Sequence, residues 1–215
     1  MKDRHRSILL WSSTILGIIA LLWGLSHIST SPNHAETPVA DLSQAAEAHD
    51  HKKGPDTADY VIIEYSDFQC PACAVQAPAL DRLQNQFPDA VQIVYRHYPL
   101  TAIHKHAMLA AQATEAAAFQ GKFWDMHDVL FNTQKQWSNI DDPKDYFTKL
   151  AKSIGLDTEK FSQDITSSVA KDRVKKHIKE AENMKLRGTP SFFLNGKEIR
   201  FNTYEELSSL VTENK

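Results

Sequence analysis

The chain has 215 residues, 42% of them apolar and 24% charged, and its formal net charge at pH 7 is −3. This length corresponds to about one to one and a half domains, and the composition is that of a globular protein with an ordinary hydrophobic core. The weakly acidic balance argues against a dedicated nucleic-acid binder, which usually carries a basic face. The chain has only two cysteines, too few for a scaffold built on disulfide bonds.

Residues 1–28 have the pattern of a membrane segment. Three cationic side chains precede residues 8–28, a stretch without Asp, Glu, Lys or Arg. As a helix this stretch would span about 30 Å, roughly the hydrocarbon thickness of a bilayer. It is longer than the apolar part of an ordinary signal peptide, and no clean A-x-A cleavage site follows. We therefore predict one uncleaved N-terminal transmembrane helix, with a cleaved export signal as the alternative.

The charge distribution also predicts on which side of the membrane the rest of the chain lies. The first cationic residue after the apolar stretch is Lys52, so the positive-inside tendency places residues 29–215 outside the cytoplasm. We expect an anchored domain on the periplasmic or cell-wall face, or a soluble exported domain if the segment is cleaved. Such compartments are oxidising.

Residues 29–57 are polar and poor in large apolar side chains, which is typical of a linker. His49 and His51 within it could bind a metal ion, but we interpret them as solvated linker positions. We assign residues 58–215 to the folded domain. It opens with an apolar run at 60–65, a helical pattern from about Pro71 and a second apolar run at 91–98. This order predicts two parallel strands joined by a right-handed crossover helix.

Mostly helical sequence follows, and the chain then returns to strands. An Asn-Gly turn at 195–196 separates two short apolar runs and predicts a hairpin. The order therefore predicts a small mixed α/β sheet with a helical insertion. The expected helices of the insertion and the C-terminus cover 101–119, 122–131, 142–155, 157–165, 169–186 and 203–214, and the hairpin strands cover 191–194 and 197–201.

Both cysteines lie in one Cys-x-x-Cys motif, Cys70 and Cys73. A zinc site would need about four ligands, and no second cysteine pair exists. A disulfide across two residues would stabilise the fold only weakly. Redox chemistry has specific support, because Cys70 precedes Pro71 where a strand turns into a helix, and a helix N-terminus lowers the pKa of a thiol. Cys73 lies one turn further, placed to attack a mixed disulfide.

Three blocks, EYSDFQCPAC, AAQATEAAAFQGKFWDMHDVLF and RGTPSFFLNG, occur in this order. In them the chain resembles the DsbA-like thioredoxin-fold thiol–disulfide oxidoreductases, above all exported or membrane-anchored bacterial members, over residues 58–215. The resemblance implies a thioredoxin fold whose helical insertion lies between the second strand and a cis-proline hairpin. With the N-terminal segment, this fold would follow one transmembrane helix.

The resemblance also implies roles for individual residues. Cys70 would be the exposed nucleophile that forms a mixed disulfide with a client protein, and Cys73 the buried resolving cysteine. Pro190 would be a cis-proline facing the pair, and the backbone of Thr189 would be free to pair with a client strand. The alternative for Pro190 is a trans-proline that starts a strand.

Glu64 interrupts an otherwise apolar strand six residues before Cys70. A buried carboxyl group usually has a raised pKa. In the family that the chain resembles, an acidic residue at this position lies under the active site and helps to move the proton of Cys73. The alternative is an outward-facing glutamate on an edge strand.

Pro71 and Ala72, between the cysteines, would contact clients. The strongest oxidants of the family carry a histidine between their cysteines, which stabilises the thiolate, and this chain has none there. We therefore predict a reduction potential between those of thioredoxin and DsbA, roughly −270 and −120 mV.

The resemblance implies an enzyme that donates the Cys70–Cys73 disulfide to folding exported proteins and needs no cofactor. A quinone-linked membrane partner of the DsbB-like or VKOR-like type would reoxidise it, and we expect a monomer that binds no nucleic acid. Three alternatives stay open: a reductase or isomerase kept as a dithiol by a membrane electron carrier, a non-catalytic client-binding module, and a metal chaperone. The histidines at 97, 104, 106 and 127 could contact a site, but we expect helix-surface or core-edge roles.

Overall fold

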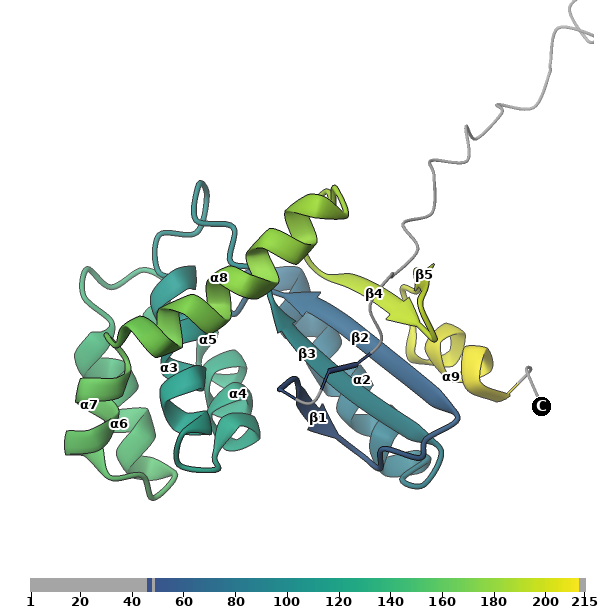
Figure 1. Ribbon diagram of the computed structural model, residues 1–215, viewed down its shortest axis with the longest axis horizontal. Helices are drawn as coiled ribbons and strands as arrows, with labels where there is room; N and C mark the ends of the chain where they lie inside the picture. The colour runs from purple at the N-terminus through teal and green to yellow at the C-terminus, as the bar shows by residue number, and fades with distance from the viewer. Residues whose placement is uncertain (1–45, 48, 213–215) are drawn as a thin grey trace, which may run out of the picture. The chain divides into compact units, whose positions relative to one another are not determined.

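Five strands form one sheet in the order β1-β3-β2-β4-β5 (Figure 1). The computed structural model describes residues 46–47 and 49–212, within the compact unit Ala40–Lys215. β2 (Tyr60–Ser66) and β3 (Val91–His97) pair in parallel and are linked by helix α2 (Pro71–Gln86), as the sequence predicts. β2 is central because β3 and β4 flank it, and both of its faces carry buried side chains.

The hairpin of β4 (Ser191–Leu194) and β5 (Lys197–Ile199) extends the sheet on the other side of β2. Its turn contains Asn195 and Gly196, both with positive φ, which confirms the predicted hairpin. β5 ends at Ile199 rather than at the expected residue 201. Helix α9 (Tyr204–Thr212) follows and packs on the α2 side of the sheet.

The predicted linker boundary at residue 57 is wrong, because β1 (His51–Lys53) pairs antiparallel with β3. The strand is only three residues long and polar, so it carries no strand signal in the sequence. Its backbone is held from the insertion as well, since Trp124 Nε1 donates a hydrogen bond to the Lys52 carbonyl over 2.9 Å. Gly54 then turns the chain with φ 104°, where an added Cβ would lie 2.4 Å from the Val91 carbonyl oxygen.

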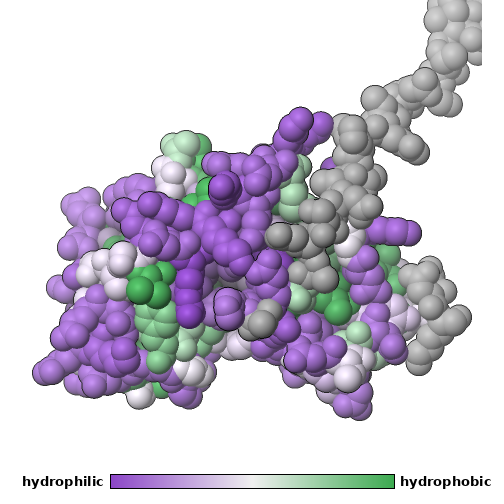
Figure 2. All heavy atoms as spheres, in the orientation of Figure 1, coloured by the Kyte–Doolittle hydropathy of each residue, from purple (hydrophilic) through white to green (hydrophobic). Residues whose placement is uncertain are grey.

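Helices between β3 and β4 form the predicted insertion, which lies beside the sheet in Figure 1. The long α8 runs from this helical group back to the sheet, and Figure 2 shows that the face carrying it is mostly hydrophilic. The short α5 is absent from the sequence prediction. The helices are α3 (Ala107–Ala118), α4 (Phe123–Asn132), α5 (Gln134–Trp137), α6 (Lys144–Ser153), α7 (Thr158–Asp164) and α8 (Ser168–Asn183).

Helix α3 begins at Ala107, six residues later than predicted. Long-range contacts hold the preceding segment in turns, because the carboxylate of Asp67 accepts hydrogen bonds from the Leu100 backbone N–H over 2.8 Å and from His104 Nδ1 over 2.7 Å. The Ala-rich composition of this stretch favours helix throughout. Tertiary contacts override that propensity in its first turn.

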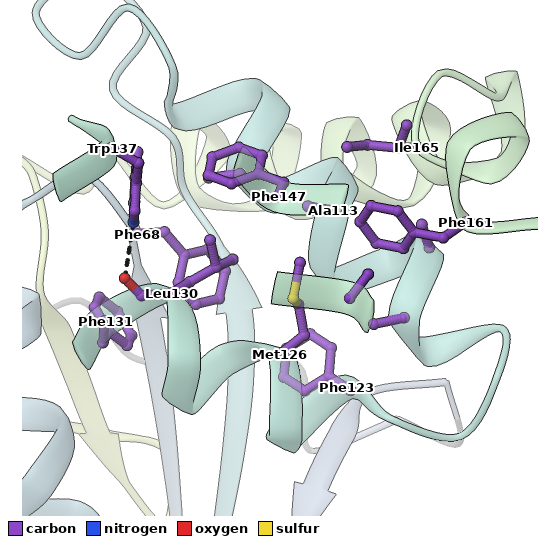
Figure 3. Packing of buried hydrophobic residues seen from close by; sticks show 14 of the residues in the cluster. Phe68, Ala113, Phe123, Met126, Leu130, Phe131, Trp137, Phe147, Phe161 and Ile165 are labelled. Carbon is purple, nitrogen blue, oxygen red and sulfur yellow. Dashed lines mark hydrogen bonds between the residues drawn. The ribbon is translucent and has the colours of Figure 1, made fainter. Parts of the chain in front are cut away.

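The largest hydrophobic cluster belongs to the insertion and to the Cys-x-x-Cys segment together. Figure 3 shows Phe68, from the loop before Cys70, among aromatic and aliphatic side chains of α4 and α5. The indole of Trp137 closes one side of this cluster and donates a hydrogen bond to the Leu130 carbonyl over 2.9 Å. The cysteine pair is thus packed against the insertion, not only against the sheet.

Within the part of the chain that the structure describes, no helix is long and apolar enough to cross a bilayer. The predicted membrane segment, residues 8–28, lies outside the described residues.

Candidate active site

Cys70 and Cys73 occupy the first turn of α2, directly after the loop that leaves β2. Cys70 has an extended backbone at the helix N-cap, with Pro71 as the first helical residue, as predicted. Both residues carry free thiols, Cys70 being 6% and Cys73 0% exposed. The expectation of an exposed Cys70 is wrong in this structure, because both thiols are buried and Cys70 keeps only a small accessible fraction.

The pKa values of the two thiols are shifted in opposite directions, because their surroundings differ. A hydrogen bond from the Cys73 thiol, with the backbone N–H groups of Cys73 and Ala72, lowers the pKa of Cys70 to about 5. Burial raises the pKa of Cys73 well above its ordinary value, and its bond to Cys70 and the charge of Glu64 add to this. The first turn of α2 thus favours a thiolate on Cys70 and a neutral thiol on Cys73.

The peptide bond between Thr189 and Pro190 is cis, as the sequence resemblance implied. It brings the start of β4 against the cysteine pair, where Cys70 Sγ lies 3.4 Å from the Thr189 carbonyl oxygen. That oxygen accepts from the thiol in this structure. The same oxygen could accept a backbone N–H from a strand laid alongside.

Glu64 lies at the centre of β2, paired with Tyr95 of β3 and with Phe192 of β4. The edge-strand alternative is therefore wrong, and Glu64 is only 1% exposed. Its Oε1 has no hydrogen-bond partner, and burial raises its pKa from 4.5 to about 7. Side chains alternate along a strand, so Glu64 shares its face with Ile62, whose cluster includes residues of α2.

Comparisons with known proteins are consistent with this geometry. A family model described as "Thioredoxin" matches residues 47–213. The chain belongs to the thioredoxin family.

Within the thioredoxin family its fold is DsbA-like, with a helical insertion. It superimposes on oxidised BdbD from Bacillus subtilis with a TM-score of 0.69 at 24% identity, covering 80% of this chain and 97% of BdbD. For Wolbachia pipientis alpha-DsbA1 the TM-score is 0.69 at 18% identity, covering 78% of this chain and 92% of that chain.

A longer relative, called Na(+)/H(+) antiporter NhaA 1, comes from Mycolicibacterium vanbaalenii. It is 40% identical over 166 residues, which are 75% of this chain but only 25% of that protein. This thioredoxin-family chain spans about a quarter of that relative's length, so the antiporter activity named there is not carried over to it.

The thioredoxin-family site includes a loop that the sequence did not assign to it. Asp67 is 1% exposed, and its Oδ1 accepts the backbone N–H of Gln69 over 2.7 Å. Its other oxygen holds Leu100 and His104, as described above. One carboxylate therefore fixes both the approach to Cys70 and the segment before α3.

Two glutamines join this loop to the insertion. Gln134 of α5 donates from Nε2 to the carbonyl oxygens of Phe68 and Cys70 over 2.8 and 2.9 Å. Gln69 donates to the Ser138 carbonyl over 3.0 Å and accepts from the His106 backbone N–H over 2.7 Å. These side chains satisfy backbone groups that would otherwise be buried without partners.

Of the residues assigned from the sequence, the structure brings Cys70, Cys73, Thr189, Pro190 and Glu64 to one place. The spacer residues Pro71 and Ala72 are exposed beside them. Asp67, Gln69 and Gln134 were missed. Polar residues in the short loop before the first cysteine were the available signal for the first two, whereas nothing in the sequence near Gln134 indicates its partners 64 and 66 residues away.

Proposed function

We propose that the protein is a thiol–disulfide oxidoreductase that donates the Cys70–Cys73 disulfide to proteins folding outside the cytoplasm. The observation that carries the proposal is the asymmetry of the two thiols, one with a pKa lowered to about 5 and one with a raised pKa. A thiolate of low pKa is a good leaving group, which favours release of client from a mixed disulfide with Cys70. The pKa of Cys70 lies between the pKa values typical of the reactive cysteines of DsbA and thioredoxin, roughly 3.5 and 7.

The reaction would begin when a client thiolate attacks Sγ of Cys70 in the disulfide form. A client–Cys70 disulfide forms, the Cys70–Cys73 bond breaks, and the Cys73 thiolate takes up a proton. A second client thiolate then attacks the client sulfur of the mixed disulfide and expels the Cys70 thiolate. The client loses two electrons and gains one disulfide, while the protein ends as the dithiol. A quinone-linked membrane protein of the DsbB-like or VKOR-like type would take those electrons.

Glu64 would supply the proton that Cys73 needs when the disulfide opens. Its pKa of about 7 keeps a large fraction of the carboxyl protonated near neutral pH. Thr189 and the exposed Pro71 and Ala72 would contact the client, with the Thr189 carbonyl pairing with the client backbone.

The first test is the equilibrium reduction potential of the full chain in glutathione buffers, with oxidation of a reduced, unfolded model protein measured in parallel. We expect a potential clearly above about −270 mV and stoichiometric transfer of disulfides. Cys73→Ala should trap the mixed disulfide, and Cys70→Ala should abolish it. A potential at or below the thioredoxin value would favour a reductase, and client binding that survives Cys70→Ala unchanged would favour a non-catalytic module.

We further propose that residues 8–28 anchor the protein, with the thioredoxin-like domain on the extracytoplasmic side. The uncharged length of this stretch supports the proposal. Full-length protein should remain in the membrane fraction after alkaline washing, and external protease should digest the domain in spheroplasts. Recovery of a shortened chain in the soluble fraction would instead favour a cleaved export signal, and recovery of the intact chain there would mean that residues 8–28 do not anchor it.

A further inference from the structure

Three potential metal ligands from three different elements meet away from the cysteine pair. His51 lies on β1, His97 at the end of β3 and Glu115 in the middle of α3. The Nε2 atoms of His51 and His97 lie 2.7 and 3.0 Å from Glu115 Oε1. One ligand atom from each residue lies within 4.8 Å of the other two. Sequence analysis assigned His51 to the linker, so this cluster became visible only with β1 in the sheet.

We propose that His51, His97 and Glu115 form a Zn²⁺ site. Two imidazole nitrogens and one carboxylate oxygen are a ligand set that zinc uses in proteins, with a fourth position left for water. Ligand atoms about 2.0–2.2 Å from a tetrahedral ion are roughly 3.3 Å apart. The two nitrogen–oxygen spacings, 2.7 and 3.0 Å, are somewhat shorter than this, so Glu115 Oε1 would have to move away from both imidazoles to admit the ion.

Hydrogen bonding alone also accounts for part of the geometry, since a carboxylate oxygen can accept from two imidazole N–H groups. A site shaped for a metal should in addition have ligands that are held in place by a second layer of contacts. Two such contacts are present. Arg173 Nη1 lies 3.2 Å from Glu115 Oε2, the oxygen that faces away from the imidazoles, and the His51 ring stacks on Phe123 with centroids 3.6 Å apart and planes 6° apart.

Burial of the cluster makes its polar groups costly unless they are well paired. The side chains of Glu115 and His97 are 1% and 0% exposed, and that of His51 is 11% exposed. The positive charge of Arg173 would lower the affinity of this place for a cation. The guanidinium contacts the outer oxygen of Glu115, however, and leaves Oε1 to the imidazoles. A bound Zn²⁺ would join β1, β3 and the insertion at one point.

The cluster borders a cavity on the side of His51. A cavity of about 410 Å³ is lined by His51 and Arg173, with Phe123 and Trp124 among its other walls. It is large enough for water, which could reach His51 and complete the coordination of an ion. Neither cysteine lines the cavity, so the proposed site is separate from thiol chemistry and does not depend on the proposed function.

The test uses the full chain in detergent with Cys70→Ser and Cys73→Ser, which removes thiolates as zinc ligands. Zinc is titrated against a chromophoric indicator, and Co²⁺ absorption serves as a spectroscopic probe. We expect one high-affinity site, and an affinity at least roughly 100-fold weaker in Glu115→Gln or His51→Phe, because loss of a ligand should exceed the effect of losing an outer contact. His51→Phe keeps a ring to stack on Phe123.

The matched control is His104→Ala. Like His51, His104 is a mostly buried histidine, with 17% of its side chain exposed, and it pairs over 2.7 Å with a buried carboxylate, that of Asp67. It lacks a third ligand, so its removal should leave zinc affinity unchanged. No stoichiometric site, or equal affinity in the parent, Glu115→Gln and His51→Phe, would overturn the proposal.

A measurement on the thiol-free parent needs no ligand variant, so its result cannot come from a variant that has misfolded. X-ray absorption at the zinc edge of the thiol-free parent should show two imidazoles in a shell of nitrogen and oxygen, and absence of imidazole scattering would overturn the proposal. Zinc should also raise the melting temperature of the parent and not that of a folded Glu115→Gln protein, since a ligand that binds only the native state stabilises it. An equal rise in both would count against the site.

Discussion

Glu64 shows how one buried carboxyl group couples the stability of this fold to its chemistry. The group lies on the central strand with no partner for Oε1, and burial raises its pKa to about 7. A protonated Glu64 is needed to donate a proton to Cys73, and an ionised one is costly to keep buried. The same property that makes it useful near neutral pH should therefore make the protein less stable there.

We expect Glu64→Gln to stabilise the reduced protein at pH 8 and to have little effect at pH 4. In the unfolded chain the carboxyl ionises near pKa 4.5, and in the folded protein near 7, so the native state binds more protons between these values and wild-type stability falls as pH rises. Over this interval the loss is on the order of 3 kcal/mol. Urea unfolding at both pH values measures it, and equal differences at pH 4 and pH 8 would contradict the prediction.

The residue between the cysteines should tune the potential. Ala72→His places an imidazole beside the Cys70 thiolate, and a decrease of about one unit in the thiol pKa corresponds to a rise of about 30 mV in reduction potential. Glutathione equilibration measures the potential, and ultraviolet titration of the thiolate measures the pKa. Gln76→His, one turn further along α2, is the control and should change neither value. An unchanged potential in Ala72→His would refute this explanation of weaker oxidising power.

At the scale of elements, the insertion supports the active-site loop as well as covering the sheet. Phe68 packs between Tyr95 of β3 and Phe131 of α4, with ring centroids 5.1 and 4.8 Å away. Gln134 of α5 binds the carbonyls on either side of Gln69. The position of Cys70 therefore depends on a four-residue helix that has little stability of its own.

Replacing Gln134 by leucine should destabilise the protein by roughly 2–4 kcal/mol, because two buried carbonyl oxygens lose their donor. The reduction potential should also shift, since the backbone around Cys70 is no longer held. Gln136→Leu is the matched control, as Gln136 lies exposed on the same helix, and it should change stability by less than about 0.5 kcal/mol. Equal unfolding midpoints for the two variants would show that Gln134 does not support the loop.

Sequence patterns predicted the elements that carry a local signal, such as an apolar run, helical spacing of apolar residues or a turn dipeptide. The apolar runs of β2 and β3, the Asn195–Gly196 hairpin and most helices of the insertion were identified with small errors at their ends. β1 was missed because an edge strand of three polar residues is stabilised by its partners. The late start of α3 and the role of Gln134 were missed for the same reason, since each depends on residues more than thirty positions away.

At the scale of the whole molecule, the segment before β1 ties the first part of the domain to its later helices. The side chain of Asp50 is 2% exposed, and its carboxylate accepts a hydrogen bond from Arg96 Nη2 of β3 over 2.8 Å. His177 Nε2 of α8 lies 3.5 Å from the other Asp50 oxygen, and Lys176 of α8 pairs with Glu47. Residues 46–47 and 49–53 are therefore part of the cooperative fold, and a fragment that starts at residue 58 would lack them.

Asp50→Asn should destabilise the protein by about 3–5 kcal/mol at pH 7, because the buried guanidinium of Arg96 loses a carboxylate partner. Asp56→Asn is the control: Asp56 also pairs with a cation, Lys52, but its side chain is 79% exposed, and such pairs contribute about 0–1 kcal/mol.

Hydrogen bonds from His177 and Arg96 outweigh burial and lower the pKa of Asp50 from 3.8. Its contribution is therefore present above that value and lost as pH falls below it. Urea unfolding should show a large gap between wild type and Asp50→Asn at pH 7 that narrows below pH 4. A gap as small as that of Asp56→Asn would mean that the N-terminal segment is docked on the domain without stabilising it.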